Sequence, residues 1–126
     1  MLLVRLSARC HPTESRDKVA VAMSNIFPDA IVEGDDPLEA TSSSVEMFSE
    51  LLKRQRIRDA ARSVLRRGTS GDSTSFRLNK QVAAVGRISF SQETHALGDI
   101  EITLKSDDIE GLIDSIAPDT RRMDAP

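Results

Sequence analysis

Alternation of apolar and polar residues is the clearest pattern along the chain. Residues 2–10 place an apolar or small side chain at every second position, with Arg5 and Arg9 on the opposite side. Successive side chains of a β-strand point to opposite faces, so this pattern predicts a strand with one buried face. The same reasoning predicts further strands at 30–33, 38–43, 76–78, 85–90 and 100–105.

Apolar residues recur at helical spacing in three other segments, at 13–27, 44–67 and 106–117. In the second segment the apolar stripe has two registers, which do not join smoothly near Arg54 and Gln55. We therefore expect a kink, or a break into two helices, at that point, and a helix end at Gly68. The pattern over 79–84 is ambiguous, and one helical turn is one interpretation of it.

The predicted order of elements is β-α-β-β-α-β-β-β-α, and nearly every strand has a single apolar face. This combination predicts an α+β fold of two layers, with a mixed or antiparallel sheet and with helices on one face. The chain has 126 residues, which fits one domain. We expect that domain to span residues 1–118, with a loop at 91–98 and a flexible tail at 119–126.

The composition indicates the cellular compartment in which the protein is expected. A single cysteine excludes an internal disulfide and is typical of a reducing compartment. The first ten residues alternate and carry two arginines, unlike a signal peptide. No stretch approaches the roughly 20 apolar residues that span a membrane. We expect a cytoplasmic protein without membrane association. The net charge is −3, so binding to a polyanion would need an uneven distribution of charge.

Positive charge is concentrated in one segment, 53–67. There, seven basic residues stand against one acidic residue, Asp59. Arginine suits bidentate contacts with phosphate and stacking on exposed bases. Four of the arginines are spaced by four and would form one row on a continuous helix. The segment supplies most of the candidate nucleic-acid-binding residues: Lys53, Arg54, Arg56, Arg58, Arg62, Arg66 and Arg67.

A structural role explains the same segment equally well. The arginines could be the solvated side of an amphipathic helix, with Glu50 pairing with Arg54. They could also form an interface in a homodimer or an accessory subunit. Partners across such an interface would be acids such as Asp107, Asp108, Glu110 or Asp114. Charge placement alone leaves nucleic-acid binding and an interface both open.

A second basic set lies on the outward faces of the predicted strands: Arg5, Arg9, Arg77, Arg87 and Lys105. It could make the open sheet face basic, but ordinary surface decoration is the favoured interpretation. The chain has neither Trp nor Tyr, and Phe76 and Phe90 fall on apolar strand faces. A platform for base stacking needs outward aromatic side chains, so contacts with phosphate and sugar are expected instead.

Catalytic and metal-binding groups are sparse. Cys10, His11 and His95 lack paired spacing, and Cys10 falls on the apolar face of its strand. The loop at 68–74 follows a predicted helix and lacks the Lys of a P-loop. We expect no enzyme activity, no metal site and no cofactor.

Three long segments resemble a family of small, uncharacterised archaeal proteins that carry an RNA-binding label. They are LLKRQRIRDAARSVLRRG at 51–68, SFRLNKQVAAVGRISF at 75–90 and HALGDIEITLKSDDIEGLIDSIAP at 95–118. CHPTE at 10–14 and IFPDA at 26–30 fit the family too. The matched positions are Arg54, Gln55, Arg56, Arg62, Arg66, Gly68, Leu78, Asn79, Lys80 and Gln81.

The resemblance implies a fold like that of ribosomal protein L-five and a role in RNA binding, in which Lys80 would join the arginines on phosphate. For 79–81, capping of the backbone at a bend is the favoured interpretation. Related chains occur joined to a nucleotide-kinase domain, which implies a regulatory or accessory role as the alternative. The polar run at 41–44 and the scarcity of aromatic residues depart from the family pattern.

Overall fold

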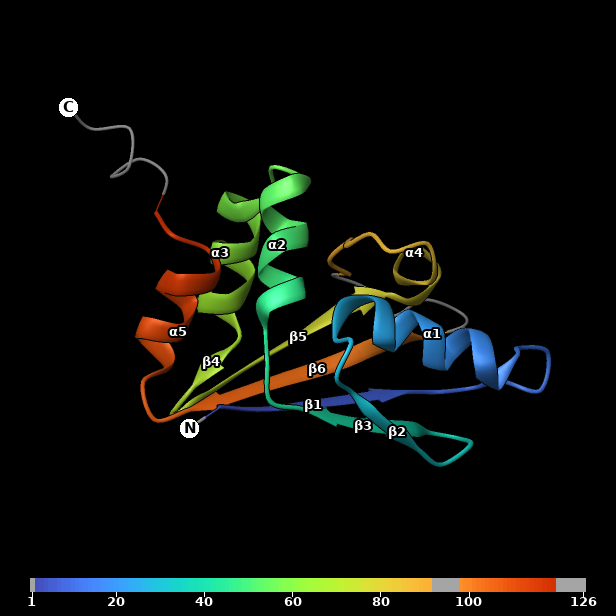
Figure 1. Ribbon diagram of the computed structural model, residues 1–126. Coiled ribbons are helices and arrows are strands. Elements are labelled where there is room, and N and C mark those ends of the chain that lie inside the picture. The colour runs from blue at the N-terminus through green and yellow to red at the C-terminus, as the bar shows by residue number, and fades with distance from the viewer. Residues whose placement is uncertain (1, 92–97, 120–126) are drawn as a thin grey trace.

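The computed structural model describes residues 2–91 and 98–119 (Figure 1). Its strands form one six-stranded sheet in the order β2-β3-β1-β6-β5-β4, and every neighbouring pair is antiparallel. The strands are β1 (Leu2–Ala8), β2 (Ile31–Glu33), β3 (Leu38–Ser42), β4 (Thr69–Ser70), β5 (Ser73–Asn79) and β6 (Asp99–Ser106). The expected α+β sheet is confirmed, and it is antiparallel throughout.

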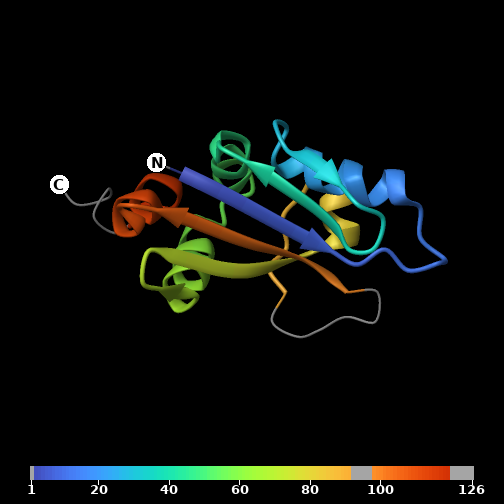
Figure 2. The ribbon, with the colours of Figure 1, turned by 90° about the horizontal axis from the view of Figure 1, so that it is seen from below.

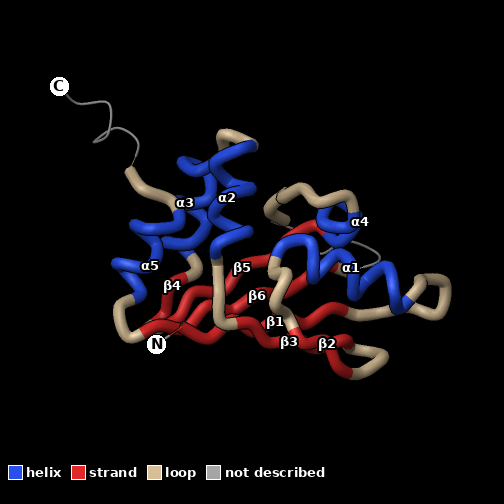
Figure 3. The backbone as a smooth tube through the Cα atoms, viewed as in Figure 1, coloured by secondary structure: helices blue, strands red, loops and turns tan. Residues whose placement is uncertain are grey.

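The helices of the described residues all lie on one side of this sheet (Figures 1 and 3). Seen from below, the strands present the face that no helix covers (Figure 2). The helices are α1 (Arg16–Ile26), α2 (Glu46–Arg54), α3 (Arg58–Arg67), α4 (Lys80–Ala84) and α5 (Ile109–Ile116). The expected two layers, with the helices on one face, are therefore confirmed.

The core lies between these two layers. On β1, Val4, Leu6 and Ala8 are buried, while Arg5 is exposed on the open face. The central strand β6 repeats the pattern with Ile102 and Leu104 buried. Because the side chains of a strand alternate, one face of β1, β3, β5 and β6 meets the helices, and the other faces solvent.

The irregular junction within 44–67 is a break into two helices, as expected. Helix α2 ends at Arg54 and α3 begins at Arg58. At the far end, Gly68 closes α3 with φ −84°, which is not a left-handed conformation. A Cβ at this position would lie 2.1 Å from the Ser75 carbonyl oxygen. Glycine is required there because two backbone segments approach closely, and not because of its φ angle.

The predicted order of elements was wrong in the region of 85–90. That segment is not a strand, and Phe90 makes only an isolated bridge with Leu78. The Asn79 side chain accepts the Val82 N–H and starts α4, which confirms the single helical turn. Gly86, at φ 77°, then turns the chain, and residues 89–91 run back beside β5. The predicted loop after Gly68 also contains the short strand β4.

Some expectations lie outside the described residues. They include most of the loop at 91–98, His95 and nearly all of the tail at 119–126. The likeness to ribosomal protein L-five stays a prediction.

Candidate nucleic-acid interface

Helices α2 and α3 stand side by side on the sheet, and their connection lies at the end far from the strands (Figure 1). The buried side of α2 carries Phe48 and Leu52, and that of α3 carries Ala61 and Leu65. Both helices therefore pack apolar residues into the core. The basic residues take the remaining sides, so we call this pair of helices, residues 46–67, the arginine hairpin.

Arg56 closes the first helix of the hairpin in a left-handed conformation, with φ 57°. Its N–H donates to the Lys53 carbonyl at 3.1 Å, and the Ile57 N–H donates to the Leu52 carbonyl at 3.1 Å. These two bonds are the pattern of a Schellman motif, in which the left-handed position usually holds glycine. Arg56 is the only non-glycine residue with positive φ in the described residues.

Gln55 ties the tip of the hairpin to the segment at 85–90. Its amide nitrogen donates to the Ile88 carbonyl at 2.9 Å, and its amide oxygen accepts the Ile88 N–H at 2.7 Å. The contact satisfies the backbone of a segment that has no strand partner there. The residue before Ile88 is Arg87, which is exposed. The sequence had placed Arg87 on a strand, and the contact of its neighbour Ile88 with Gln55 was missed.

Most cations of the arginine hairpin face solvent. Lys53, Arg54, Arg56, Arg66 and Arg67 are exposed, and Arg58 is half-buried. Arg54 pairs with Glu50 at 3.2 Å, on the surface, where such a pair contributes little. Arg67 donates to the Ser63 carbonyl at 3.4 Å. Within residues 2–91 and 98–119, no carboxylate pairs with Lys53, Arg56, Arg58 or Arg66.

Arg62 differs from the other arginines of the hairpin. Its guanidinium donates to Asp114 of α5 at 2.6 Å and to the Ala117 carbonyl at 3.1 Å. Its side chain is only 17% exposed. Asp114 was one candidate for a partner across an interface, and it pairs with Arg62 within the same chain. The break at Arg54 also divides the expected row, which leaves Arg58, Arg62 and Arg66 on α3.

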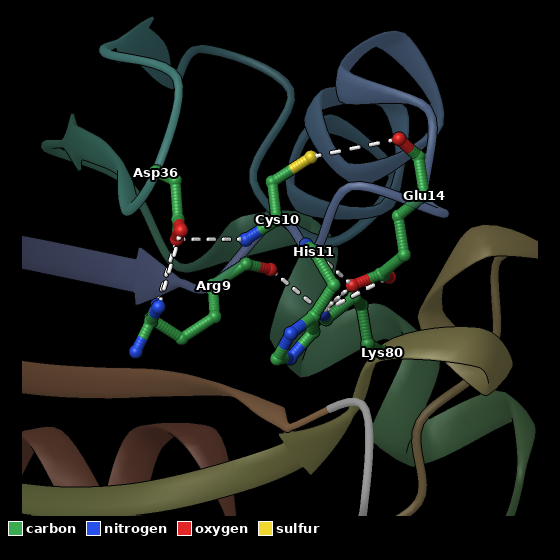
Figure 4. A network of polar contacts seen from close by, with 6 residues as sticks. All are labelled: Arg9, Cys10, His11, Glu14, Asp36 and Lys80. Carbon is green, nitrogen blue, oxygen red and sulfur yellow. Dashed lines mark hydrogen bonds and ion pairs between the residues drawn. The ribbon is translucent and has the colours of Figure 1, made fainter.

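Lys80 lies away from the hairpin, in a polar cluster at the start of α4 (Figure 4). Its ammonium donates to the Glu14 carboxylate at 3.0 and 3.1 Å and to the Arg9 carbonyl at 2.7 Å. The Lys80 side chain is 5% exposed, and that of Glu14 is 14% exposed. The structure thus does not bring Lys80 together with the arginines, and it surrounds the ammonium with acceptors.

The same cluster, which we call the Lys80 cluster (Arg9, Cys10, Glu14, Asp36 and Lys80), lowers the pKa of two carboxyl groups. Arg9 donates to Asp36 at 2.7 and 3.1 Å, and the Cys10 N–H donates at 3.1 Å. The Arg9 hydrogen bond is the main cause that lowers the pKa of Asp36 to about 2. Burial acts to raise the pKa of Glu14, but hydrogen bonds from the His11 N–H and Lys80 outweigh it and lower that pKa.

The open sheet face carries both signs of charge. Arg77 stands opposite Glu101, and Arg5 lies between Thr41 and Thr103. Glu33 and Glu39 add acids at the β2 and β3 edge. Arg9 belongs to the Lys80 cluster, and Lys105 lies 4.0 Å from Asp72. The second basic set is therefore dispersed, and the sheet face is not uniformly basic.

Within residues 2–91 and 98–119, no three His, Cys, Asp or Glu side chains form a group that could hold a metal ion. No helix in that part of the chain is both long and apolar enough to cross a membrane.

Comparison with known proteins gives a match over most of the chain. A family model described as RNA binding matches residues 3–106. A UPF0201 protein of Methanothermobacter thermautotrophicus is 41% identical over 120 residues, which are 92% of this chain and 91% of the relative. A UPF0200/UPF0201 protein of Archaeoglobus fulgidus is 41% identical over 122 residues. That match covers 94% of this chain but only 38% of the relative.

Solved structures match as well. A UPF0201 protein from Methanococcus jannaschii is 39% identical, with a TM-score of 0.86, and the match covers 93% of each chain. Another crystal structure of a UPF0201 protein is 39% identical, with a TM-score of 0.87, covering 93% of this chain and 94% of that chain. The arrangement of layers described above is thus shared with both crystal structures.

Proposed function

This chain belongs to the archaeal UPF0201 family and matches a family model described as RNA binding, and from this premise we propose that its arginine hairpin binds the phosphate backbone of RNA. Phosphate contacts supply affinity without reading sequence, so the binding would tolerate many sequences. The proposal draws support from where the cations lie and from the partners that they have within the chain.

Six of the eight candidate residues are suited to this role. They are the cations of the hairpin whose side chains are not held by α5: Lys53, Arg54, Arg56, Arg58, Arg66 and Arg67. Arg62 is held by Asp114, and Lys80 is buried against Glu14. We propose that these last two residues stabilise the fold and do not contact RNA.

Arg56 is the observation that carries the proposal. A left-handed conformation costs a non-glycine residue about 1 kcal/mol, and glycine would avoid that cost. The side chain is exposed and has no carboxylate partner in the described residues, so it contributes no ion pair that would offset the cost. A strained residue of this kind is a reason to look for function. We infer that this exposed guanidinium at the tip of the hairpin is one of the groups that meet phosphate.

The substitution Arg56→Gly separates function from stability. We expect the free energy of unfolding to stay the same or to rise by about 1 kcal/mol, because the strain is relieved. We expect the affinity for single-stranded RNA to fall, and the slope of log K against log salt to become shallower by about 0.7, the value for one lost phosphate contact. Fluorescence anisotropy at several salt concentrations measures both quantities.

Lys18→Ala is a matched control, because Lys18 is an exposed cation on α1, outside the hairpin. This control removes the same charge and is expected to leave both affinity and slope unchanged. Equal effects of the two substitutions would show that only total charge matters and would contradict a site at the hairpin.

An accessory role is the second candidate, with the hairpin docking onto a protein partner. The length of the Archaeoglobus fulgidus relative favours it, because most of that relative lies outside the match. A regulatory partner such as a nucleotide kinase, or a second copy of the chain, would fit this role. Under this alternative, Arg56→Gly leaves RNA binding unchanged and changes the mass of the assembly measured by light scattering.

A further inference from the structure

A groove runs between the end of α3 and the outer side of β5. Its volume is about 360 Å³, which is within the range of small-molecule sites. One wall comes from α3, with Val64 and Arg67, and the other comes from β5 and the segment that follows α4. The lining residues that matter here are Val64, Arg67, Phe76, Arg77, Phe90 and Ser91.

The groove is the place where the aromatic residues of this protein reach the surface. The chain has four phenylalanines and no Trp or Tyr, and all four belong to one continuous series of ring contacts. Ring centroids lie 5.7 Å apart for Phe27 and Phe48, 5.4 Å for Phe48 and Phe76, and 5.9 Å for Phe76 and Phe90. The first three rings are buried, and Phe90 is half-buried in the groove.

The backbone holds Phe90 in place. The Asn79 N–H donates to the Ser89 carbonyl at 2.8 Å, and the Ser91 N–H donates to the Arg77 carbonyl at 2.9 Å. These bonds flank Phe90 on both sides and fasten its segment to β5. The rings of Phe90 and Phe76 form a T-shaped pair. Phe90 is therefore a preorganised surface, which does not have to be ordered when a ligand arrives.

Arg67 links the groove to the arginine hairpin. It is the last residue of α3, it is exposed, and its side chain makes one hydrogen bond within residues 2–91 and 98–119, to the Ser63 carbonyl. Helix α3 has ten residues and so extends about 15 Å from the hairpin tip to the groove. A nucleic-acid strand that follows the hairpin cations would thus arrive at an aromatic ring beside an arginine.

We propose that this groove receives one unpaired nucleobase of the bound RNA, stacked on Phe90, while Arg67 contacts a neighbouring phosphate. The inference rests on the proposed function and deepens it, because it names single-stranded RNA as the ligand. Bases within a duplex are stacked on one another and cannot enter a groove on a protein surface, whereas the bases of a single strand can stack on an aromatic side chain.

A comparison of two RNA ligands tests the groove without altering the protein. The first is a short, fluorescein-labelled oligouridylate, and the second is the same chain of ribose phosphates with no base at any position. Both present the same phosphates to the arginines. We expect the natural oligonucleotide to bind roughly 5- to 150-fold more tightly, the range for stacking of one base on an aromatic side chain. Anisotropy titrations at one salt concentration measure the ratio.

Two variants then test whether Phe90 causes this difference in affinity between the two oligonucleotides. Phe90→Leu keeps an apolar side chain but removes the aromatic ring, so the ratio should fall to near 1 through weaker binding of the natural oligonucleotide alone. Phe90→Tyr keeps the ring and should keep the ratio. Thermal melting of both variants checks that the fold persists.

The outcomes separate the two proposals. Equal, salt-sensitive binding of both oligonucleotides to the unaltered protein would overturn the nucleobase groove and leave the RNA-binding hairpin in place. A protein side chain as the natural occupant of the groove would give this same result. Absence of salt-sensitive binding for both oligonucleotides would overturn the proposed function, and the groove with it. If Phe90→Leu still bound the natural oligonucleotide more than 5-fold more tightly than the base-free one, the base would stack at a site other than Phe90.

Discussion

The Lys80 cluster and the arginine hairpin use the same kinds of basic residue in opposite ways. In the cluster, Lys80 is 5% exposed and surrounded by the Glu14 carboxylate and the Arg9 carbonyl. In the hairpin, Lys53, Arg56 and Arg66 are exposed, and no carboxylate of residues 2–91 or 98–119 pairs with them. Burial of a cation requires a partner, because an uncompensated charge in the interior is costly.

This difference shows which cations are available to a ligand. A cation that already has short hydrogen bonds would have to break them in order to meet phosphate, whereas an exposed one gives up only water. Charge in the sequence is therefore a weak guide by itself, and the partners of each charge decide its role.

Removing the Lys80 ammonium should produce the largest loss of stability. In Lys80→Met, the Glu14 carboxylate stays buried without its main cation, which costs about 3 kcal/mol of unfolding free energy. Urea denaturation measures this loss. RNA affinity, measured where the variant is fully folded, should be unchanged, because Lys80 does not belong to the proposed interface.

The double substitution Lys80→Met with Glu14→Gln is the control. It removes both charges, and the amide oxygen of the introduced glutamine can still accept the His11 N–H that the Glu14 carboxylate accepts now. Part of the lost stability should return. A loss below about 1 kcal/mol in the single variant would mean that solvent screens the pair as it screens a surface ion pair.

Arg62 and Arg66 form a second contrast, within one helix. Arg62→Ala removes bonds to Asp114 and to the Ala117 carbonyl and should cost about 1.5 kcal/mol of stability. Arg66→Ala removes an exposed side chain, so its stability should change by less than about 0.5 kcal/mol. RNA affinity should fall in Arg66→Ala and stay unchanged in Arg62→Ala, because only Arg66 belongs to the proposed interface. Urea denaturation and anisotropy on both variants provide the comparison.

The reverse result would change the assignment. If Arg62→Ala weakened RNA binding in a fully folded protein and Arg66→Ala did not, the face of α3 toward α5 would be the binding side.

Periodicity predicted most of the fold, because each strand and helix has one face toward a single core. It predicted the break near Gln55, where two apolar registers meet, and the break is present. It failed at 85–90, where Ile88 and Phe90 alternate like the residues of a strand. Gly86 turns this segment, and the Gln55 side chain supplies the hydrogen bonds that a neighbouring strand would have given. Contacts between residues so distant in sequence leave no local pattern.

The candidate site could be predicted only in part, for a similar reason. Local charge density identified the segment at 53–67 but could not show that Arg62 turns toward Asp114 on α5. The pairing of Lys80 with Glu14 spans 66 positions of the chain and was equally invisible. Phe90 was assigned to an apolar strand face, and its position at a surface groove follows from the loss of that strand. Positive φ at Arg56 likewise has no signature in the amino-acid sequence.

The dependence of unfolding free energy on acidic pH tests the Lys80 cluster alone, and its expected effect is the smallest. Folding lowers the pKa of Asp36 from 3.8 to about 2, chiefly through the Arg9 hydrogen bond. The ionised carboxylate therefore contributes stability that is complete above about pH 5 and is lost as pH falls through 2. Asp36→Asn should flatten this part of the curve of unfolding free energy against pH, as measured by urea denaturation. Arg56→Gly should shift the curve without changing its shape, since arginine stays protonated throughout. An unchanged curve in Asp36→Asn would mean that Asp36 is no more strongly held in the folded protein than in the unfolded chain.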